Sequence, residues 1–187
     1  NHLERELKQL ARQRKERRRK RGRNDVPIVS IVGYTNAGKS TLLNALTDSD
    51  VLAEDKLFAT LDTRSRRLRF PREREVVITD TVGFIRDLPK ELFAAFRATF
   101  EEAQDADLLL HVIDSAAPNV DDHIATTEKL LQELHLDRVP RLVVYNKADA
   151  LEPFEAQERA RAQDGVAVSA LQQSTLRPLL LRMEQML

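Results

Sequence analysis

The sequence predicts a doubly wound α/β domain, in which a mainly parallel sheet has helices on both faces and one antiparallel strand at an edge. Short apolar runs rich in branched residues recur along the chain, as expected for strands that are buried on both faces. Amphipathic stretches of helical period lie between them, and this alternation implies right-handed crossovers in a parallel sheet. The expected strands are Val26–Val32, Val76–Thr79, Leu108–Ile113, Leu142–Tyr145 and Val166–Val168.

The expected helices lie near residues 39–47, 90–104, 119–135, 153–163 and 174–187. Arg66–Phe70 precedes the turn sequence PRERE, which indicates that this segment pairs with the strand at 76–79 as a hairpin at one edge of the sheet. Ligands of doubly wound folds bind at the carboxyl ends of the strands. The functional residues are therefore expected directly after the apolar runs.

The chain divides into a basic arm and an acidic domain. Residues 1–23 contain eleven of the 30 Lys and Arg but three of the 30 Asp and Glu, so the remainder is net acidic and is not expected to bind nucleic acid broadly. Three leucines in the arm recur at helical spacing without a partner, which indicates a piece of a longer protein. Gly22–Pro27 would end that helix. We therefore expect a basic helical linker segment at 1–24 and a nucleotide-binding domain at 25–187.

The composition excludes several kinds of site. The chain has no Cys, which rules out disulfides, iron–sulfur clusters and cysteine-ligated zinc. Its four His are scattered without the spacing of metal ligands. No apolar run approaches the roughly 18 residues that a membrane span requires. We expect no membrane span and a cytoplasmic location.

A phosphate-binding loop follows the first expected strand. Residues 33–40 read GYTNAGKS and match GxxxxGK[ST] between a strand and a helix, which predicts a P-loop NTPase. The glycines let backbone N–H groups point at phosphate oxygens, Lys39 would reach the β- and γ-phosphates, and the Ser40 hydroxyl would bind Mg²⁺. The nucleotide-binding residues expected here are Gly33, Tyr34, Thr35, Asn36, Ala37, Gly38, Lys39, Ser40 and Thr41.

A second motif, Asp80-Thr81-Val82-Gly83, follows the expected strand at 76–79 with the DxxG spacing of nucleotide-hydrolysing switch proteins. Asp80 would hold Mg²⁺ through a water molecule, and Gly83 would offer its N–H to the γ-phosphate. Phe84 then stands where the best-understood members have a water-orienting glutamine. A phenyl ring has no group suited to general base work, so Phe84 either packs as ordinary apolar filling or leaves water orientation to another group. Hydrolysis by the domain alone is expected to be slow.

The base is indicated by NKAD at 146–149, directly after the strand at 142–145. The Asp149 carboxylate can accept hydrogen bonds from N1–H and the 2-amino group of guanine, which adenine lacks, and such a site can reject the wrong base by roughly 10⁴-fold or more. Asn146 would reach the other edge of the base, and the Lys147 stem would cover one face of the ring. After the last strand, Ser169 and Ala170 are expected to present a backbone N–H to the guanine carbonyl oxygen.

With these motifs in place, the sequence resembles the HflX ribosome-binding GTPases, within the translation-associated GTPases, over about residues 25–187. The likeness rests on VGYTNAGKSTLLNAL, DKLFATLD, DTVGFIRDLP and YNKAD. The basic segment before the domain is similar to the end of the helical linker of that family. The chain departs from the family where LDTRSR replaces the usual LDPTTR and where residues 170–174 lack the usual glycines.

The resemblance implies further residues and partners. It places the switch I ligand of Mg²⁺ at Thr60, with Thr63 as the rival. It also suggests that Asn36 helps bind a K⁺ that bridges the phosphates, so that Lys39, Asn36 and Gly83 would be the catalytic residues. The implied partners are GTP, the large ribosomal subunit and its rRNA, without DNA. The basic run at 12–23 suits contact with RNA phosphates, although a solvated linker would have the same composition.

The function that these observations favour is a Mg²⁺-dependent GTP hydrolase that acts as a ribosome-associated switch, slow alone and stimulated by its partner and by K⁺. Two alternatives remain open on the sequence. The domain could bind GTP or GDP as a conformational module with negligible hydrolysis, or it could be a GTPase that drives RNA modification through dimerisation.

Overall fold

The structure is a computed structural model that describes residues 26–47, 64–72, 74–81, 83, 97, 100 and 102–187. Over this part of the chain, six strands form one sheet in the order β2-β3-β1-β4-β5-β6. The edge strand β2 is antiparallel to β3, and all the other neighbouring pairs are parallel. The sheet therefore has the predicted doubly wound architecture with one antiparallel edge strand.

The elements lie close to their expected positions. The strands are β1 (Ile28–Gly33), β2 (Arg64–Arg69), β3 (Glu75–Asp80), β4 (Leu108–Asp114), β5 (Arg141–Asn146) and β6 (Val166–Ala167). The α-helices are α2 (Lys39–Thr47), α4 (Val120–Glu133), α5 (Pro153–Ala162) and α6 (Leu176–Met186). Short 3₁₀ turns are η1 (Glu102–Asp105), η2 (Ala148–Ala150) and η3 (Gln173–Thr175).

Strand β1 shows why the apolar runs form central strands. Its residues alternate between the two faces of the sheet, so Val29 and Ile31 pack into one apolar cluster while Val32 packs into another. All three are fully buried. A strand with helices on both sides needs apolar residues on both faces, and this requirement produces the mostly apolar run in the sequence. Ser30 interrupts it, and its hydroxyl is hydrogen-bonded with that of Thr79.

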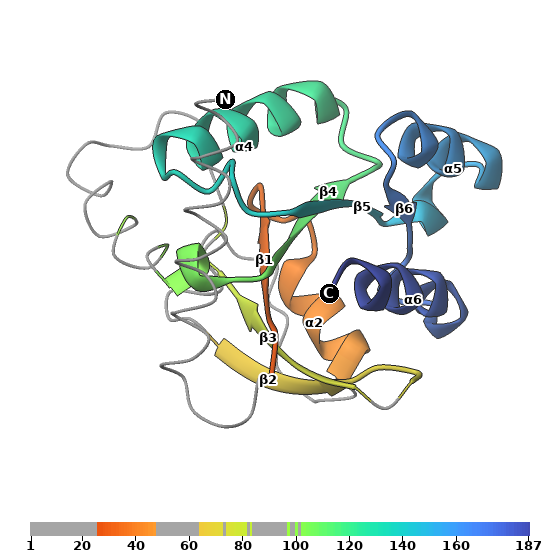
Figure 1. Ribbon diagram of the computed structural model, residues 1–187. Coiled ribbons are helices and arrows are strands. Elements are labelled where there is room, and N and C mark those ends of the chain that lie inside the picture. Colours follow the sequence, from red (N-terminus) through yellow and green to blue (C-terminus); the bar gives the residue numbers. More distant parts are fainter. Residues whose placement is uncertain are drawn as a thin grey trace, which may run out of the picture.

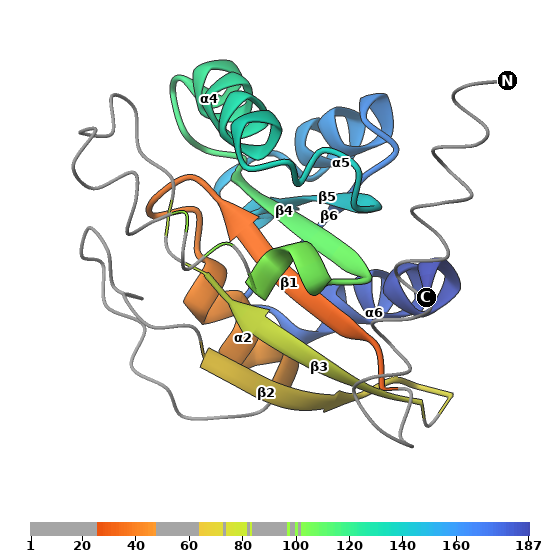
Figure 2. The ribbon, with the colours of Figure 1, turned by 60° about the vertical axis from the view of Figure 1, so that its left-hand side comes forward.

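Helices cover both faces of the sheet, as Figures 1 and 2 show. Helices α2 and α6 lie on one face, where Leu42 and Leu179 join the larger apolar cluster. Helices α4 and α5 lie on the opposite face, where Leu131 and Ala160 belong to two smaller clusters. The loops after β1, β3 and β5 emerge at the carboxyl ends of these parallel strands, which is where the predicted motifs lie.

Two expected boundaries differ from the structure. The expected helix at 174–187 is divided into η3 and α6, because the Thr175 side chain turns back to the loop after β6 and its Oγ1 accepts a hydrogen bond from Ser169 N at 2.9 Å. The strand expected at 166–168 ends at Ala167, although Val168 N still donates to Tyr145 O at 2.8 Å. Both differences arise at element ends, where side-chain contacts decide the backbone path.

Some expectations lie outside the described residues. These are the linker segment at 1–24, the domain boundary near 25, Val82, Phe84, both candidate threonines of switch I (Thr60 and Thr63), and most of the helix expected near 90–104. Within the described part of the chain, no helix is long and apolar enough to cross a membrane.

Candidate functional site

The phosphate loop connects β1 to α2 and depends on two glycines. A Cβ at Gly33 would lie 2.3 Å from the Val112 carbonyl oxygen of the adjacent strand β4. Gly38 has a left-handed backbone, with φ of 87°, and a Cβ there would lie 2.3 Å from Asn146 Nδ2. Both positions therefore require glycine, and the loop passes close to the ends of β4 and β5.

The DxxG glycine lies against this loop. A Cβ at Gly83 would be 2.9 Å from Thr35 Cα and 3.1 Å from Lys39 Nζ. The structure thus brings together the carboxyl ends of β1 and β3, as the sequence predicted. Of the remaining loop residues, Ala37 is buried, whereas Tyr34 and Thr41 are partly exposed.

Lys39 is the buried cation of the site. It is 7% exposed, and its Nζ donates a hydrogen bond to the Tyr34 carbonyl oxygen at 3.1 Å. Burial lowers the pKa of Lys39 from 10.5 to about 8, and the attraction of Asp80 offsets part of that effect. Because an anion beside the amine favours its charged form, bound phosphates would raise the pKa of Lys39 again.

Ser40 and Asp80 form an oxygen pair that fits Mg²⁺. Ser40 Oγ, in the first turn of α2, donates to Asp80 Oδ2 at 2.6 Å, and Asp80 is 1% exposed at the end of β3. Mg²⁺ prefers oxygen ligands and is commonly held by one or two carboxylates together with substrate phosphates. Among the described residues there is no group of three or more His, Cys, Asp or Glu that could hold a metal by itself. The pair therefore suits a metal that is bound jointly with a nucleotide.

Asn146 joins the predicted base-recognition loop to the phosphate loop. The residue is 1% exposed at the end of β5. Its Nδ2 donates to Ala37 O at 3.0 Å, and its Oδ1 accepts from Ala170 N at 3.1 Å. The Asn146 side chain thus connects Ala37, which lies 109 residues before it in the sequence, with Ala170, which lies 24 residues after it.

Lys147 makes a second connection between the same two loops. Its Nζ donates to the Asn36 carbonyl oxygen at 2.8 Å and to Asp114 Oδ2 at 2.7 Å. Asn36 and Lys147 both have left-handed backbones, with φ of 60° and 61°. Asp149 lies two residues further on, in η2, and is exposed, so its carboxylate is accessible to a ligand.

The loop after β6 contains the last predicted residues. Ser169 is fully buried, and its Oγ accepts a hydrogen bond from Leu171 N at 3.2 Å. The Ala170 N–H, which we expected to face the guanine carbonyl oxygen, donates to Asn146 Oδ1. This loop is therefore tied to NKAD by hydrogen bonding, although it lacks the usual glycines.

Sequence reasoning missed several supporting residues. Asp114 ends β4 and Ser115 follows it. Ser115 N donates to Asn146 O at 3.0 Å, so the end of β4 fixes the end of β5. The Tyr34 ring of the phosphate loop stacks on the His123 ring of α4, with centroids 3.9 Å apart and an angle of 8° between the planes. The position of Asp114 at a strand end was a usable signal, whereas the stacked pair left no pattern in the sequence.

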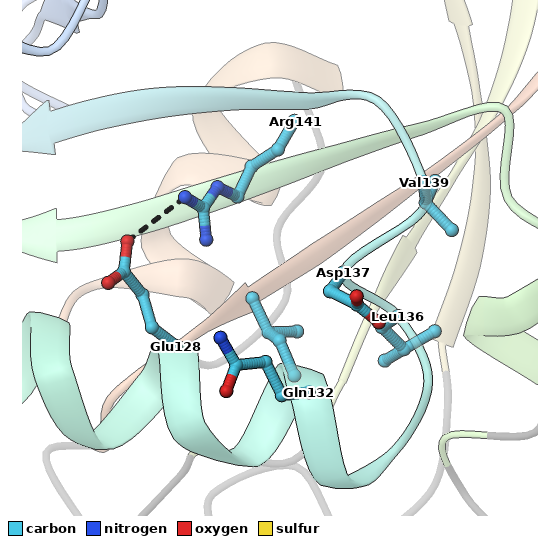
Figure 3. A pocket seen from close by; sticks show the side chains of 7 residues that line it. Glu128, Gln132, Leu136, Asp137, Val139 and Arg141 are labelled. Carbon is cyan, nitrogen blue, oxygen red and sulfur yellow. Dashed lines mark hydrogen bonds and ion pairs between the residues drawn. The ribbon is translucent and has the colours of Figure 1, made fainter. Parts of the chain in front are cut away.

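Figure 3 shows a cavity of 430 Å³ that is separate from this site. It lies between α4, the loop that follows it and the amino end of β5, whereas the phosphate loop lies at the carboxyl ends of the strands. Arg141 and Glu128 form an ion pair at 3.0 Å across it. Its lining residues are Glu128, Leu131, Gln132, Leu136, Asp137, Val139 and Arg141.

Comparison with known proteins gives a consistent result. A family model described as "50S ribosome-binding GTPase" matches residues 28–147. A curated GTPase HflX of Caldanaerobacter subterraneus subsp. tengcongensis is 55% identical over 150 residues, which are 80% of this chain and 35% of that protein. The GTPase HflX of Alkalihalophilus pseudofirmus is 45% identical over 187 residues, which are 100% of this chain and 44% of that protein. The chain thus spans less than half the length of these relatives.

The fold comparison leads to the same class of protein. The crystal structure of a GTP-binding protein from Sulfolobus solfataricus in complex with GDP matches with a TM-score of 0.68 and 28% identity. The match covers 86% of this chain and 52% of that chain. A structure of Aquifex aeolicus Era bound to GDP·AlF4⁻ matches with a TM-score of 0.63 and 26% identity, and covers 87% of this chain and 57% of that chain.

Proposed function

Because the chain belongs to the 50S ribosome-binding GTPase family and contains an HflX-type GTPase domain, we propose that it binds GTP with Mg²⁺, hydrolyses it to GDP and phosphate, and acts as a switch on the large ribosomal subunit. One observation carries the proposal. Asn146 Nδ2 lies 3.0 Å from Ala37 O, which joins the loop that would read guanine to the loop that would hold the phosphates. In this proposal, residues 25–187 are the GTPase domain and residues 1–24 are a basic linker that acts near rRNA in the cytoplasm.

Nucleotide binding would use contacts that the fold has already arranged. The N–H groups of residues 33–41 would bind the phosphates, because consecutive amides around the glycines can point at one anion. Asp149 would read guanine, and the Ala170 N–H would have to leave Asn146 Oδ1 to reach the guanine carbonyl oxygen. The Lys147 stem would lie over the ring, since its Nζ is already held by Asn36 O and Asp114.

Mg²⁺ would be held by the Ser40 hydroxyl and, through water, by Asp80, with Thr60 as the proposed ligand from switch I. The ion would supply positive charge to the phosphate oxygens. Lys39 would remain protonated beside the phosphates, and Gly83 would offer its N–H to the γ-phosphate when it lies next to Thr35, as it does here. These residues sense the terminal phosphate and stabilise charge on it.

Acceleration of hydrolysis would come from outside these residues. Switch GTPases without their activating group turn over at about 10⁻⁴ to 10⁻³ s⁻¹, and a supplied charge restores on the order of 10⁵-fold. We assign this role to K⁺, bound with help from Asn36, and to the ribosomal partner, which would order the switches. The exposed position of Asn36 and its left-handed backbone at the loop support access of its side chain to a ligand.

The test is multiple-turnover GTP hydrolysis in KCl and in NaCl, with and without large ribosomal subunits. We expect slow hydrolysis alone, faster hydrolysis with subunits, and a KCl advantage that Asn36→Ala removes. Equal rates in both salts would refute the K⁺ role. Turnover indistinguishable from buffer, even with subunits, would favour the non-hydrolysing module. Activity that rises with protein concentration would favour the dimerising RNA-modification GTPase.

A further inference from the structure

The β2–β3 hairpin concentrates positive charge on a domain that is otherwise acidic. Six arginines lie between residues 64 and 74, without any lysine, against the acids Glu73 and Glu75. The described parts of this segment are β2, β3 and the turn that joins them at the edge of the sheet. The arginines are Arg64, Arg66, Arg67, Arg69, Arg72 and Arg74.

The strand alternation directs Arg67 and Arg69 to the surface, and Arg72 and Arg74 at the turn are also exposed. Arg66 instead shares the face of buried Leu68 and is only partly exposed, with its Nε buried. Leu68 and Phe70 are buried in the cluster under α2 and α6, so the intervening Arg67 and Arg69 lie on the opposite face of β2 and are exposed. The side chains of Arg67 and Arg72 are 80% and 75% exposed. Burial of the apolar residues thus holds the arginines on a rigid, outward-facing strand and turn.

The ion pairs within the protein leave these guanidinium groups largely available. Arg67 lies 3.9 Å from Glu75, and Arg72 lies 4.0 Å from Glu184, which are distances at the limit of an ion pair. The Arg67–Glu75 pair joins two exposed side chains, and such pairs contribute little, about 0 to 1 kcal/mol. An RNA phosphate could therefore replace that contact at small cost, whereas Arg72 is exposed but faces the buried carboxylate of Glu184.

We propose that the β2–β3 hairpin is an RNA-docking surface that binds the phosphate backbone without reading base sequence. Arginine presents a planar fork that matches phosphate oxygens. At a rise of about 3.3 to 3.4 Å per residue, alternate side chains of β2 are spaced about 7 Å apart along one face, which suits contact with successive anionic groups. Phe70 is 3% exposed, so the hairpin offers no ring on which bases could stack.

An acidic protein is the competing partner, and the surface fits it less well. Protein interfaces have an apolar, often aromatic centre inside a polar rim. Among the described residues, the exposed large apolar side chains are Phe154 and Leu171, and neither belongs to the hairpin. The arginines could also serve to prevent the edge strand from pairing with another sheet. That role needs only a few charges of either sign, so it does not explain why they are all arginine. The four exposed arginines, Arg67, Arg69, Arg72 and Arg74, without any lysine, favour phosphate recognition.

The hairpin is connected directly to the nucleotide site. Arg64 pairs with Asp80 in the register of β2 and β3, and Asp80 accepts the hydrogen bond from Ser40. RNA bound along β2 would therefore lie beside the strand that carries Asp80 of the DxxG motif. The identification of this RNA as rRNA rests on the proposed function. The new part of the inference is the place of contact on the domain.

The test is the binding of a fluorescein-labelled RNA duplex of arbitrary sequence, measured by anisotropy from 50 to 200 mM KCl. The variant is Arg67→Glu/Arg69→Glu, and the matched control is Arg138→Glu/Arg161→Glu, which changes the same charge at exposed positions away from the hairpin. We expect the hairpin variant to weaken binding on the order of tenfold or more and to reduce the log–log salt slope by roughly 1.5 to 2, because about two phosphate contacts are lost. Its GDP affinity and its GTPase rate without RNA should stay within about twofold of the wild type.

Equal losses of RNA affinity in the hairpin variant and the control, or no loss of RNA affinity in either, would overturn the proposal. Large ribosomal subunits form the second arm. If the hairpin variant lost subunit binding but kept full affinity for RNA, the surface would bind an acidic protein instead. If subunits failed to stimulate even the wild-type chain, the proposed ribosomal function would be wrong, while the RNA affinities would still decide the docking surface.

Discussion

Replacing Lys39 by Met should stabilise the chain in the absence of nucleotide while abolishing nucleotide binding. Lys39 is 7% exposed, and burial lowers its pKa to about 8 from 10.5. Its ammonium group is therefore in an unfavourable environment in the folded protein, even with Asp80 nearby. Methionine has a similar length, carries no charge and fills the same space.

The size of the effect follows from the pKa shift. One pKa unit corresponds to 1.36 kcal/mol, so a pKa lowered from 10.5 to about 8 means that the folded state is destabilised by about 3 kcal/mol at pH 7, where Lys39 is charged in both states. Loss of the hydrogen bond to Tyr34 O offsets about 1 kcal/mol. The net gain for Lys39→Met should be about 2 kcal/mol, or roughly 4 to 8 °C in Tm for a domain of this size.

The stability gained by Lys39→Met should become smaller as the pH rises. Between the folded pKa of about 8 and the unfolded value of 10.5, the unfolded wild-type chain binds more protons than the folded chain, so wild-type stability from this group rises with pH. This part of the wild-type stability is present in full above pH 10.5 and is lost as the pH falls to about 8. The advantage of Lys39→Met is therefore largest below pH 8. It should nearly vanish by about pH 9.5, where the remaining wild-type penalty of about 1 kcal/mol equals the contribution of the lost hydrogen bond.

The assay is equilibrium unfolding in urea, followed by circular dichroism at pH 7 and pH 9.5 without nucleotide. Lys129→Met, at an exposed lysine of α4, is the control and should change stability by less than about 0.5 kcal/mol. GDP at 100 times its Kd should stabilise the wild type by about 2.7 kcal/mol and leave Lys39→Met unchanged. A variant less stable than wild type at pH 7, or a gain that is the same at both pH values, would refute this reasoning.

Three further substitutions test the contacts around the site by the same unfolding assay. Asn146→Ala leaves the buried Ala37 carbonyl and the partly buried Ala170 N–H without their partner and should cost about 2 to 4 kcal/mol, whereas exposed Asn119→Ala should change stability by less than about 0.5 kcal/mol. Glu184→Met should raise the free energy of unfolding by about 1 to 3 kcal/mol, since this carboxylate is 6% exposed, neither oxygen has a hydrogen bond, and Arg72 lies as far as 4.0 Å away. A loss of stability would contradict that view. His123→Ala should cost about 0.5 to 1.5 kcal/mol through its ring contact with Tyr34, and His123→Phe should restore it; a Phe variant no better than Ala would exclude stacking as the cause.

The fold could be predicted from the sequence because each central strand is buried on two faces. Leu108–Ile113 is apolar except for the buried His111, and it becomes β4 with one additional residue, Asp114. Hydrophobic periodicity does not determine where a helix begins when a side chain near its start is hydrogen-bonded to another segment. Thr175 contacts the loop at Ser169, and α6 therefore begins at Leu176 and not at 174.

The site could be predicted where its chemistry requires a fixed spacing. Gly33, Gly38 and Lys39 belong to a motif, and the structure gives each a steric or electrostatic reason for its identity. Asp114 belongs to no such motif, and its contact with Lys147 depends on the register of β4 and β5. The arginine hairpin was hidden for another reason, because averaging charge over residues 24–187 gives an acidic total that conceals a local basic surface.

The burial of Lys39 links the stability of the domain to its affinity for nucleotide. An amine in water would have to lose its hydration on binding a phosphate, whereas Lys39 has lost most of its hydration on folding. A phosphate oxygen also accepts a stronger, charge-assisted hydrogen bond than the Tyr34 carbonyl does. Binding can therefore recover much of the roughly 3 kcal/mol by which the charged amine destabilises the folded chain, which corresponds to about a hundredfold in affinity. The same interaction should thus appear with opposite signs in the two halves of the Lys39→Met experiment, as a gain in stability without GDP and as a loss of affinity for it.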